Sequence, residues 1–403
     1  MFNREALRHV LLDEKMTVPR SDTEVETEVD ASLAAWLGSG RPGDGALAAD
    51  RALLFHRINL NGLGPLLALK SDLAAVPSDL AQFLRKALIA REMWEEQHRR
   101  VVSQALDALY AAGLHPLLTK GTALAYTLYP RPAARMRGDS DILIEENLKL
   151  QAFAALEEAG FSRPLYRRGV DFGRGDVVRA SGRDGGWHDI DLHWRLDSSP
   201  VLARIFTHAE LLARSQPVLA LHAQARCPSA VDALLYSAVH RKKHIDRPTK
   251  IHLNGVAHPV IDSLTWLMDI HLLFGSLDRD EQERLVARAA ERDISDILRA
   301  ALADSDARLG TTVPDDIAGA LASAKPGSVS RYIAAAPARA VLMNLVATQS
   351  LLTRVTGLSE IFFPPPEYMR ARFSRGRADW LPVLYLRRIL PGVAKHVFRK
   401  GKP

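Results

Sequence analysis

The sequence predicts an α+β fold in which a small mixed β-sheet is flanked by N-terminal helices and a C-terminal helical domain. Three observations support this prediction. Apolar residues recur at helical spacing before residue 113 and again after residue 199, while residues 113–199 alternate short extended segments with two helical ones. We therefore expect an N-terminal helical region at 1–112, an α/β core at 113–199, a helical domain at 200–366 and a basic amphipathic tail at 367–403.

The composition is that of an ordinary globular protein. The 403 residues are 47% apolar and 25% charged, which is enough chain for two or three domains. The single cysteine, Cys227, excludes an intrachain disulfide and a cysteine-rich metal site. No apolar run of signal-peptide type follows the first five residues, and none approaches the roughly twenty residues of a spanning helix. We expect a cytoplasmic protein without a membrane span.

The N-terminal region is predicted to be helical throughout. Apolar spacing predicts a helix over residues 46–60, which the run Asn61–Pro65 ends. Ser78 and Asp79 are expected to cap a long helix that continues to Gly113. Four charged residues are expected on the solvent side of that helix: Glu95, Glu96, Arg99 and Arg100. Nothing in this region indicates catalysis.

The α/β core begins with a short strand that leads into a helix. Residues 117–119 are typical of a buried strand, and Gly121 then opens a helix that continues to Leu128. A glycine at this junction lets a phosphate approach the backbone, and free N–H groups at a helix start favour anions. Lys120 adds a positive charge and Thr122 adds a hydroxyl donor. The turn is therefore suited to holding a triphosphate.

Two aspartates stand two residues apart on the next predicted strand. Asp139 and Asp141 precede the apolar run Ile142–Ile144, and side chains two apart on a strand leave the same face. Paired carboxylates are costly unless a cation lies between them. Mg²⁺ fits best, since it prefers oxygen ligands and is usually held by one or two carboxylates plus substrate phosphates.

A second acidic strand follows about fifty residues later. Asp189, Asp191 and His193 alternate there with apolar residues, and one carboxylate from this strand would complete a two-metal centre. Between the two acidic strands we expect a helix over 148–159, strands over 161–168 and 176–180, and a turn at 181–186. The acidic strands are expected to be neighbours in one sheet. Arg135 and Arg137 precede the first pair and would either reach the triphosphate or form salt bridges.

After Pro200 the chain is predicted to be helical. Two helices have the clearest apolar spacing, over residues 229–243 and 263–274, and Asn254–Gly255 is typical of a hairpin turn. The run Pro364–Pro366 is expected to end the last helix of this domain and to separate it from the tail.

The tail carries most of the excess positive charge. The net charge is +6, and Asp379 is the only acid between Arg370 and Lys402. Such a segment is typical of a solvated terminal helix or an amphipathic element packed on its own protein. Binding of nucleic acid through it is the less favoured alternative.

Three motifs resemble those of nucleotidyltransferase family 5, an uncharacterised group within the DNA polymerase beta-like nucleotidyltransferase superfamily. They are Lys120–Leu124, Arg137–Ile144 and Ile190–Trp194, and the resemblance covers roughly residues 90–275. The superfamily pattern has a Gly-Ser or similar turn, an Asp-x-Asp strand and a lone carboxylate on a third strand. One departure is that Ser140 stands where an apolar residue is usual, which we expect to weaken strand packing slightly.

The resemblance implies a role for each matching residue. Asp139, Asp141 and Asp191 are implied as catalytic metal ligands, with Asp191 preferred to Asp189. The implied nucleotide-binding residues are Lys120, Gly121, Thr122, Arg137 and His240. His240 and Asp269 are carried over from the helical domain of the group, although a histidine at a helix end often faces the helix dipole and an aspartate within a helix is often solvated or paired.

The activity that the resemblance implies is an Mg²⁺-dependent transfer, with two ions and with Mn²⁺ as a substitute. A nucleoside monophosphate would pass from an NTP to a hydroxyl or phosphate of an acceptor, a small molecule or a peptide, and pyrophosphate would leave. The alternatives are a nucleotide-binding module without catalysis and an enzyme that transfers another phosphate-linked group, such as a sugar phosphate.

Overall fold

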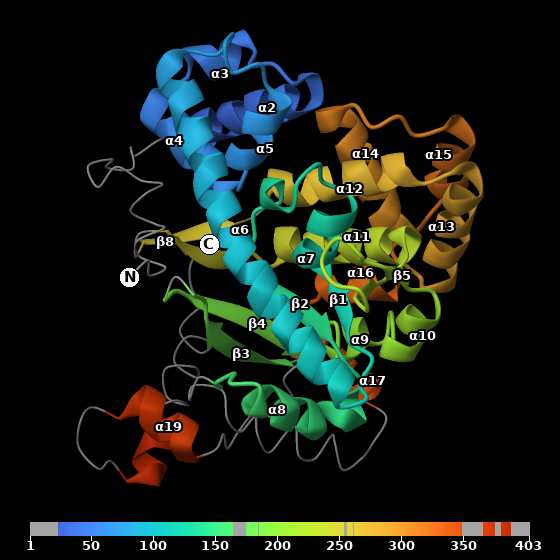
Figure 1. Ribbon diagram of the computed structural model, residues 1–403. Coiled ribbons are helices and arrows are strands. Elements are labelled where there is room, and N and C mark those ends of the chain that lie inside the picture. Colours follow the sequence, from blue (N-terminus) through green and yellow to red (C-terminus); the bar gives the residue numbers. More distant parts are fainter. Residues whose placement is uncertain are drawn as a thin grey trace.

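The computed structural model of this protein describes residues 23–163, 175–183, 185–253, 256–260, 262–348, 366–374 and 380–387. It confirms the α+β fold (Figure 1). One group of helices comes from the N-terminal part and another from the C-terminal part, and the sheet lies beside both. The long helix α6 (Ser78–Ala111) runs from the N-terminal group across the sheet (Figure 1).

Short helices precede α6: α2 (Thr23–Ser39), α3 (Asp44–Ala48), α4 (Arg51–Leu60) and α5 (Gly64–Lys70). The prediction of a single helix over 46–60 is wrong, because α3 ends at Ala48 and a new helix begins at Arg51. The Asp50 side chain caps α4 by accepting a hydrogen bond from the Leu53 N–H. The predicted end at Leu60 is confirmed. Gly62 then takes a left-handed conformation, with φ at 67°, in the turn that leads to α5.

Helix α6 joins two hydrophobic cores because its buried stripe continues along its whole length. Leu80 and Leu84 pack among the N-terminal helices, while Val102 and Leu106 pack beneath the sheet. The predicted end at Gly113 is confirmed by its φ of 75°. The expected caps are wrong, since the residue before the helix is Pro77 and no side chain caps it. Glu95 is also buried instead of facing solvent.

The sheet has the strand order β1-β2-β4-β3 within the described residues. Its strands are β1 (Leu117–Thr119), β2 (Asp139–Leu143), β3 (Gly175–Ser181) and β4 (Trp187–His193). The two outer pairings are antiparallel and the central pairing of β2 with β4 is parallel. The predicted hairpin of β3 and β4 and the predicted neighbourhood of the two acidic strands are both confirmed.

The two faces of the sheet belong to different cores. Ile142 and Ile190 point to α6 and to α8 (Lys149–Glu158), which ends before Gly160 as expected. Leu117 and Leu143 point the other way, into the core of the C-terminal helices. The strand expected over 161–168 is described only at its start, where Ser162 forms a bridge with Arg179, and the rest lies outside the described residues.

Two helices and two short 3₁₀ turns complete the connections around the sheet. Helix α7 (Lys120–Thr127) follows β1 directly, as the sequence predicts. The 3₁₀ turns η1 (Pro132–Ala134) and η2 (Glu146–Leu148) lie just before and just after β2. After β1, the chain therefore passes through α7 and η1 and returns to the sheet, where β2 begins.

The C-terminal part is mainly helical, as predicted. Its helices are α9 (Pro200–Ala203), α10 (His208–Ala213), α11 (Ala230–Asp246), α12 (Leu264–Ser276), α13 (Arg279–Glu291), α14 (Ser295–Leu309), α15 (Asp315–Ala322), α16 (Ser328–Ile333) and α17 (Pro337–Ala347). Side-chain caps from Ser229 and Ser263 fix the starts of α11 and α12. The strands β7 (Thr249–Leu253) and β8 (Val256–Val260) pair antiparallel, as expected of a hairpin, while the predicted turn residues 254–255 lie outside the described residues. The pairing of β5 (Gln216–Pro217) with β6 (Arg226–Cys227) was not predicted.

Part of the predicted tail is described. Helix α19 (Pro366–Phe373) begins at the last proline of the triple-proline run, while residues 349–365 and 388–403 lie outside the described residues. Among the helices that the structure describes, none has the length and apolar character needed to cross a bilayer.

Candidate active site

Four aspartates lie on one face of the sheet in two facing pairs. The parallel register of β2 and β4 sets Asp139 opposite Asp189 and Asp141 opposite Asp191. Because side chains two residues apart on a strand share a face, all four carboxylates leave the sheet on the same side. This concentration of negative charge requires cations nearby.

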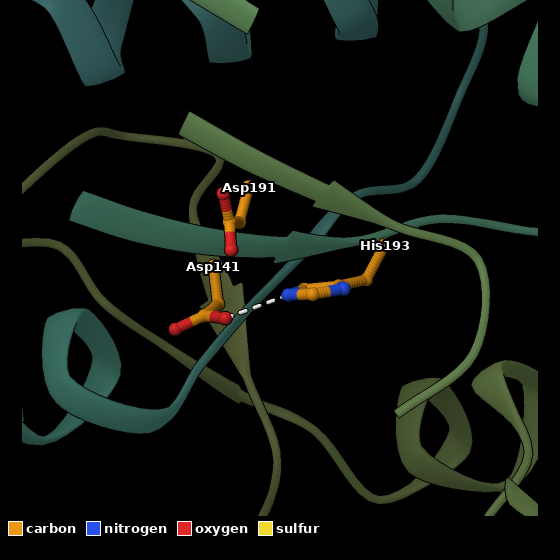
Figure 2. A group of neighbouring side chains, drawn as sticks. All are labelled: Asp141, Asp191 and His193. Atoms are coloured by element: carbon orange, nitrogen blue, oxygen red, sulfur yellow. Dashed lines mark hydrogen bonds and ion pairs between the residues drawn. The ribbon is translucent and has the colours of Figure 1, made fainter. Parts of the chain in front are cut away.

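Two of these aspartates combine with a histidine. The potential ligand atoms of Asp141, Asp191 and His193 all lie within 4.8 Å of one another, and the three side chains converge from β2 and β4 (Figure 2). The Nε2 atom of His193 is 2.6 Å from Oδ1 of Asp141. The alternation in β4 placed His193 on the acidic face, yet nothing in the sequence alone marked it as a ligand.

The other two aspartates are arranged differently. Asp139 was expected to share a metal with Asp141, but no group of three or more possible ligands among the described residues includes it. Asp139 lies two residues before Asp141 on β2, on the same face of the sheet. Asp189 forms an ion pair with Arg179 of β3, with 3.1 Å between the Arg179 Nε and the Asp189 Oδ1. Asp189 therefore has an arginine partner on the neighbouring strand, and the choice of Asp191 over Asp189 as a ligand stays a prediction.

Lys120 lies at the corner between β1 and α7 and closes on the same carboxylate. Its ammonium forms an ion pair with Oδ1 of Asp141. Its backbone has φ at 50°, a left-handed conformation that is uncommon for a side chain of this size and that costs about 1–3 kcal/mol. Burial raises the pKa of the Asp141 carboxyl, but the neighbouring Lys120 and His193 side chains outweigh burial and hold that pKa well below its usual range. Asp141 is therefore a stable anion.

The turn after Lys120 is more enclosed than the sequence suggested. Gly121 and Thr122 are both buried, and the Thr122 hydroxyl lies 2.7 Å from the Ser140 hydroxyl. Thr122 also accepts a hydrogen bond from Nε of Arg137 at 3.1 Å. The hydroxyl that was predicted to bind a phosphate thus contacts the reverse side of β2 in this structure.

Ser140 belongs to a buried polar network behind the two acidic strands. Its hydroxyl is fully buried and lies 2.7 Å from Nε2 of His98, a residue of α6. The Nδ1 of His98 lies 3.2 Å from Nδ1 of His188 in β4, and the His98 ring stacks on Trp94. The expectation that Ser140 weakens strand packing is therefore wrong, because its hydroxyl joins β2 to α6 and to the start of α7.

A second buried group holds the segment before β2. The Arg137 guanidinium forms an ion pair with Glu95 of α6 at 2.5 Å, and Tyr126 of α7 donates to the same Glu95 oxygen at 2.8 Å. Arg91 lies over the Trp94 ring at 3.6 Å from its centroid. Burial, helped by the charge of Arg137, lowers the pKa of Arg91 to about 9. In this state Arg137 is thus a buried link between α6 and the turn.

Arg135 and Asp269 are paired with each other inside the protein. Nε of Arg135 lies 2.8 Å from one Asp269 oxygen and Nη2 lies 2.7 Å from the other. The Tyr129 hydroxyl donates to the same carboxylate at 2.7 Å. This ion pair attaches helix α12 to the segment between α7 and β2, so the geometry gives Asp269 a structural role.

We expect Asp269→Ala to lower the free energy of unfolding by about 3–5 kcal/mol, because it leaves the Arg135 guanidinium buried without its counter-ion. Urea unfolding of the full chain measures this loss. Replacing the exposed Asp280 by alanine serves as the control and should change stability by about 1 kcal/mol or less. A loss below about 1 kcal/mol in Asp269→Ala would contradict the structural role.

His240 lies on α11 within a group of rings. Its ring centroid is 4.4 Å from that of His244 and 5.3 Å from that of Trp266, and Tyr236 is one turn earlier at 6.2 Å. Tyr236 shares with Lys120 the lining of a small cavity of about 20 Å³, enough for about one water molecule. The part of α11 next to Lys120 is therefore the turn that carries Tyr236, and His240 follows it along the helix.

The donor atoms at the centre fit a divalent cation. Octahedral ligands at 2.0–2.1 Å from an ion stand about 3 Å apart when adjacent and about 4.2 Å apart when opposite. One ligand atom from each of Asp141, Asp191 and His193 lies within 4.8 Å of the others, which is close to these separations. Lys120 already contributes a positive charge at this position, which indicates that the carboxylates favour a cation there.

Comparison with protein families gives one result that bears on this site. A family model described as "Uncharacterised nucleotidyltransferase" matches residues 48–310, which is more than half of the chain and includes the sheet, α6 and helices up to α14. No curated protein and no solved structure matched the chain.

Proposed function

Since the chain belongs to this family of uncharacterised nucleotidyltransferases and is therefore a transferase, we propose that it moves a nucleoside monophosphate from an NTP to an acceptor oxygen and releases pyrophosphate. The observation that carries this proposal is the meeting of Asp141 with Asp191 across the parallel pairing of β2 and β4. Two carboxylates on one face, opposite a lysine at a strand-to-helix corner, are suited to phosphoryl chemistry. The acceptor is proposed to be a hydroxyl or phosphate of a small molecule or a peptide.

The residues that would hold a divalent cation are Asp141, Asp191 and His193, and we propose Asp139 as a further ligand from the same face. The ion is proposed to be Mg²⁺ or Mn²⁺, with a second ion entering with the nucleotide. When bound, such an ion neutralises phosphate charge and lowers the pKa of an acceptor oxygen. The chain's own contribution is to fix the carboxylates on two hydrogen-bonded strands.

Lys120 is proposed to bind the triphosphate. Its ammonium has a carboxylate partner in this structure and would exchange that partner for the phosphates when the nucleotide arrives. The backbone of Gly121 and Thr122 is proposed to hold the same phosphates at the start of α7. Arg137 would support this turn through its hydrogen bond to Thr122, and His240 is proposed to contact the nucleoside from α11.

Asp191→Asn tests the proposal. The variant keeps the size of the side chain but removes one ligand charge, so we expect the rate of transfer to fall by on the order of 10²-fold, equivalent to about 3 kcal/mol of transition-state stabilisation. The assay incubates the full chain with each α-labelled NTP and Mg²⁺ or Mn²⁺, together with pools of small molecules or peptides. Transfer of label and release of pyrophosphate are both measured.

Asp189→Asn is the matched control. The residue lies two positions earlier on the same face of the same strand, and its ion-pair partner is Arg179. This variant should keep most of the transfer activity. Equal activity in Asp191→Asn and the wild type would remove Asp191 from the centre. Absence of label transfer and pyrophosphate release with every NTP and pool would count against nucleotide transfer itself.

A further inference from the structure

We propose that His193 is a nitrogen ligand of the metal centre and that it shifts the preference of this centre from Mg²⁺ toward Mn²⁺. This inference rests on the proposed function, since it concerns the same centre. The observation behind it is that an imidazole, instead of a third carboxylate, completes the group formed with Asp141 and Asp191.

The position of His193 is fixed by the same register that fixes the carboxylates. It follows Asp191 by two residues, so it leaves β4 on the acidic face, and its backbone pairs with Leu143 at the end of β2. The side chain is 3% exposed, compared with 11% for Asp141. The Nε2 atom of this buried imidazole is 2.6 Å from a carboxylate oxygen, so it lies beside the group proposed to hold the cation.

Strand β3 leaves space for the ring. Gly175 pairs with His193 across the antiparallel ladder, and a Cβ on Gly175 would lie 2.7 Å from Nδ1 of His193 and 2.3 Å from the Leu192 carbonyl oxygen. Both separations are too short for any side chain. The absence of a side chain at this position therefore allows the imidazole to lie against the β3 backbone with Nε2 directed at Asp141.

The chemistry of the donor atoms determines which ion is preferred. Mg²⁺ favours oxygen ligands and strict octahedral geometry, whereas imidazole nitrogen suits first-row transition metals better. Asp139 lies outside the compact group, so the three positions nearest one another supply two oxygens and one nitrogen. This set favours Mn²⁺ relative to Mg²⁺ more strongly than three carboxylates would.

The direct test is pulsed electron paramagnetic resonance of the full chain with Mn²⁺, alone and with α,β-methylene-ATP. A nitrogen that is bound to Mn²⁺ gives a ¹⁴N coupling in the echo modulation. We expect this coupling in the wild type, its replacement by a ¹⁵N pattern after labelling of histidine with ¹⁵N, and its loss in His193→Gln. The isotope experiment needs no variant, so it still shows whether a histidine binds the ion if His193→Gln does not fold, and the His193→Asp variant described below then identifies which one.

Competition between the two ions gives the second readout. In His193→Asp the ratio of the Mg²⁺ and Mn²⁺ dissociation constants should fall by about tenfold or more, because an oxygen replaces the nitrogen. His222→Gln is the matched control, since His222 is a half-buried histidine that pairs with Asp107 at the far end of α6. It should keep both the coupling and the ratio.

The outcomes separate this inference from the proposed function. Mn²⁺ that binds without nitrogen coupling, or with a coupling that persists in His193→Gln, would overturn the role of His193 and leave nucleotide transfer standing. No Mn²⁺ binding by the wild type, even with the nucleotide analogue, would overturn the metal centre as well.

Discussion

Asp141→Asn is expected to reduce nucleotide transfer by on the order of 10⁴-fold, the largest effect of any single change at this site. Asp141 is buried, and one of its oxygens contacts both Lys120 and His193. The variant removes the charge that brings these groups together and one of the carboxylates proposed to hold the cation. Initial rates of label transfer measure the loss.

Asparagine has nearly the same size as aspartate, so the loss of transfer activity can be distinguished from a loss of folding. Circular dichroism and the thermal midpoint should show that the variant remains folded, since an amide fills the same space beside β1. The same substitution at Asp189 provides the reference, as it lies on the same face and pairs with Arg179. Retention of full activity by Asp141→Asn would remove the assignment of the centre.

Lys120→Met is expected to reduce transfer by on the order of 10³-fold while strengthening the binding of Mn²⁺ in the absence of nucleotide. The transfer rate falls while the affinity for Mn²⁺ rises, because the ammonium has a different partner with nucleotide than without it. With nucleotide bound it would neutralise the triphosphate, whereas without nucleotide it neutralises Asp141 and competes with an incoming cation. Transfer rates and Mn²⁺ titrations monitored by electron paramagnetic resonance measure both quantities.

Lys86→Met is the reference for this prediction. Lys86 is exposed on α6, so its replacement removes one positive charge without touching the sheet. It should change neither the transfer rate nor the affinity for Mn²⁺. If Lys120→Met bound Mn²⁺ more weakly than the wild type, Lys120 could not be a competitor for the cation, and the proposed exchange of partners would be wrong.

The sequence predicted the parts of this site that depend on local pattern. The strand at 117–119, the helix that follows it and the two acidic strands all came from alternation and spacing within a few residues. Their neighbourhood in one sheet was also predicted. These features could be inferred because a period of two places Asp139 with Asp141, and Asp189 with Asp191, whatever the rest of the fold does.

The parts that the sequence could not predict depend on contacts between distant residues. Ser140 was expected to disturb packing because its partner His98 is 42 positions away on α6. Glu95 was expected to face solvent because its partner Arg137 is equally distant, and helix periodicity alone cannot distinguish a buried charge from a solvated one. His193 could be recognised as a possible metal ligand only once the strand register showed that it lies beside Asp141.

Because β2 and β4 pair in a fixed parallel register, a change in the length of either strand affects both faces of the sheet. Because side chains alternate, deleting one residue from either strand would turn carboxylates toward Val102 and Leu106 and bring isoleucines to the acidic face. Such a deletion would remove the ligands and the core together. Variation in length among related chains should therefore collect in the hairpin turn at 182–186, where an added residue leaves the pairing unchanged.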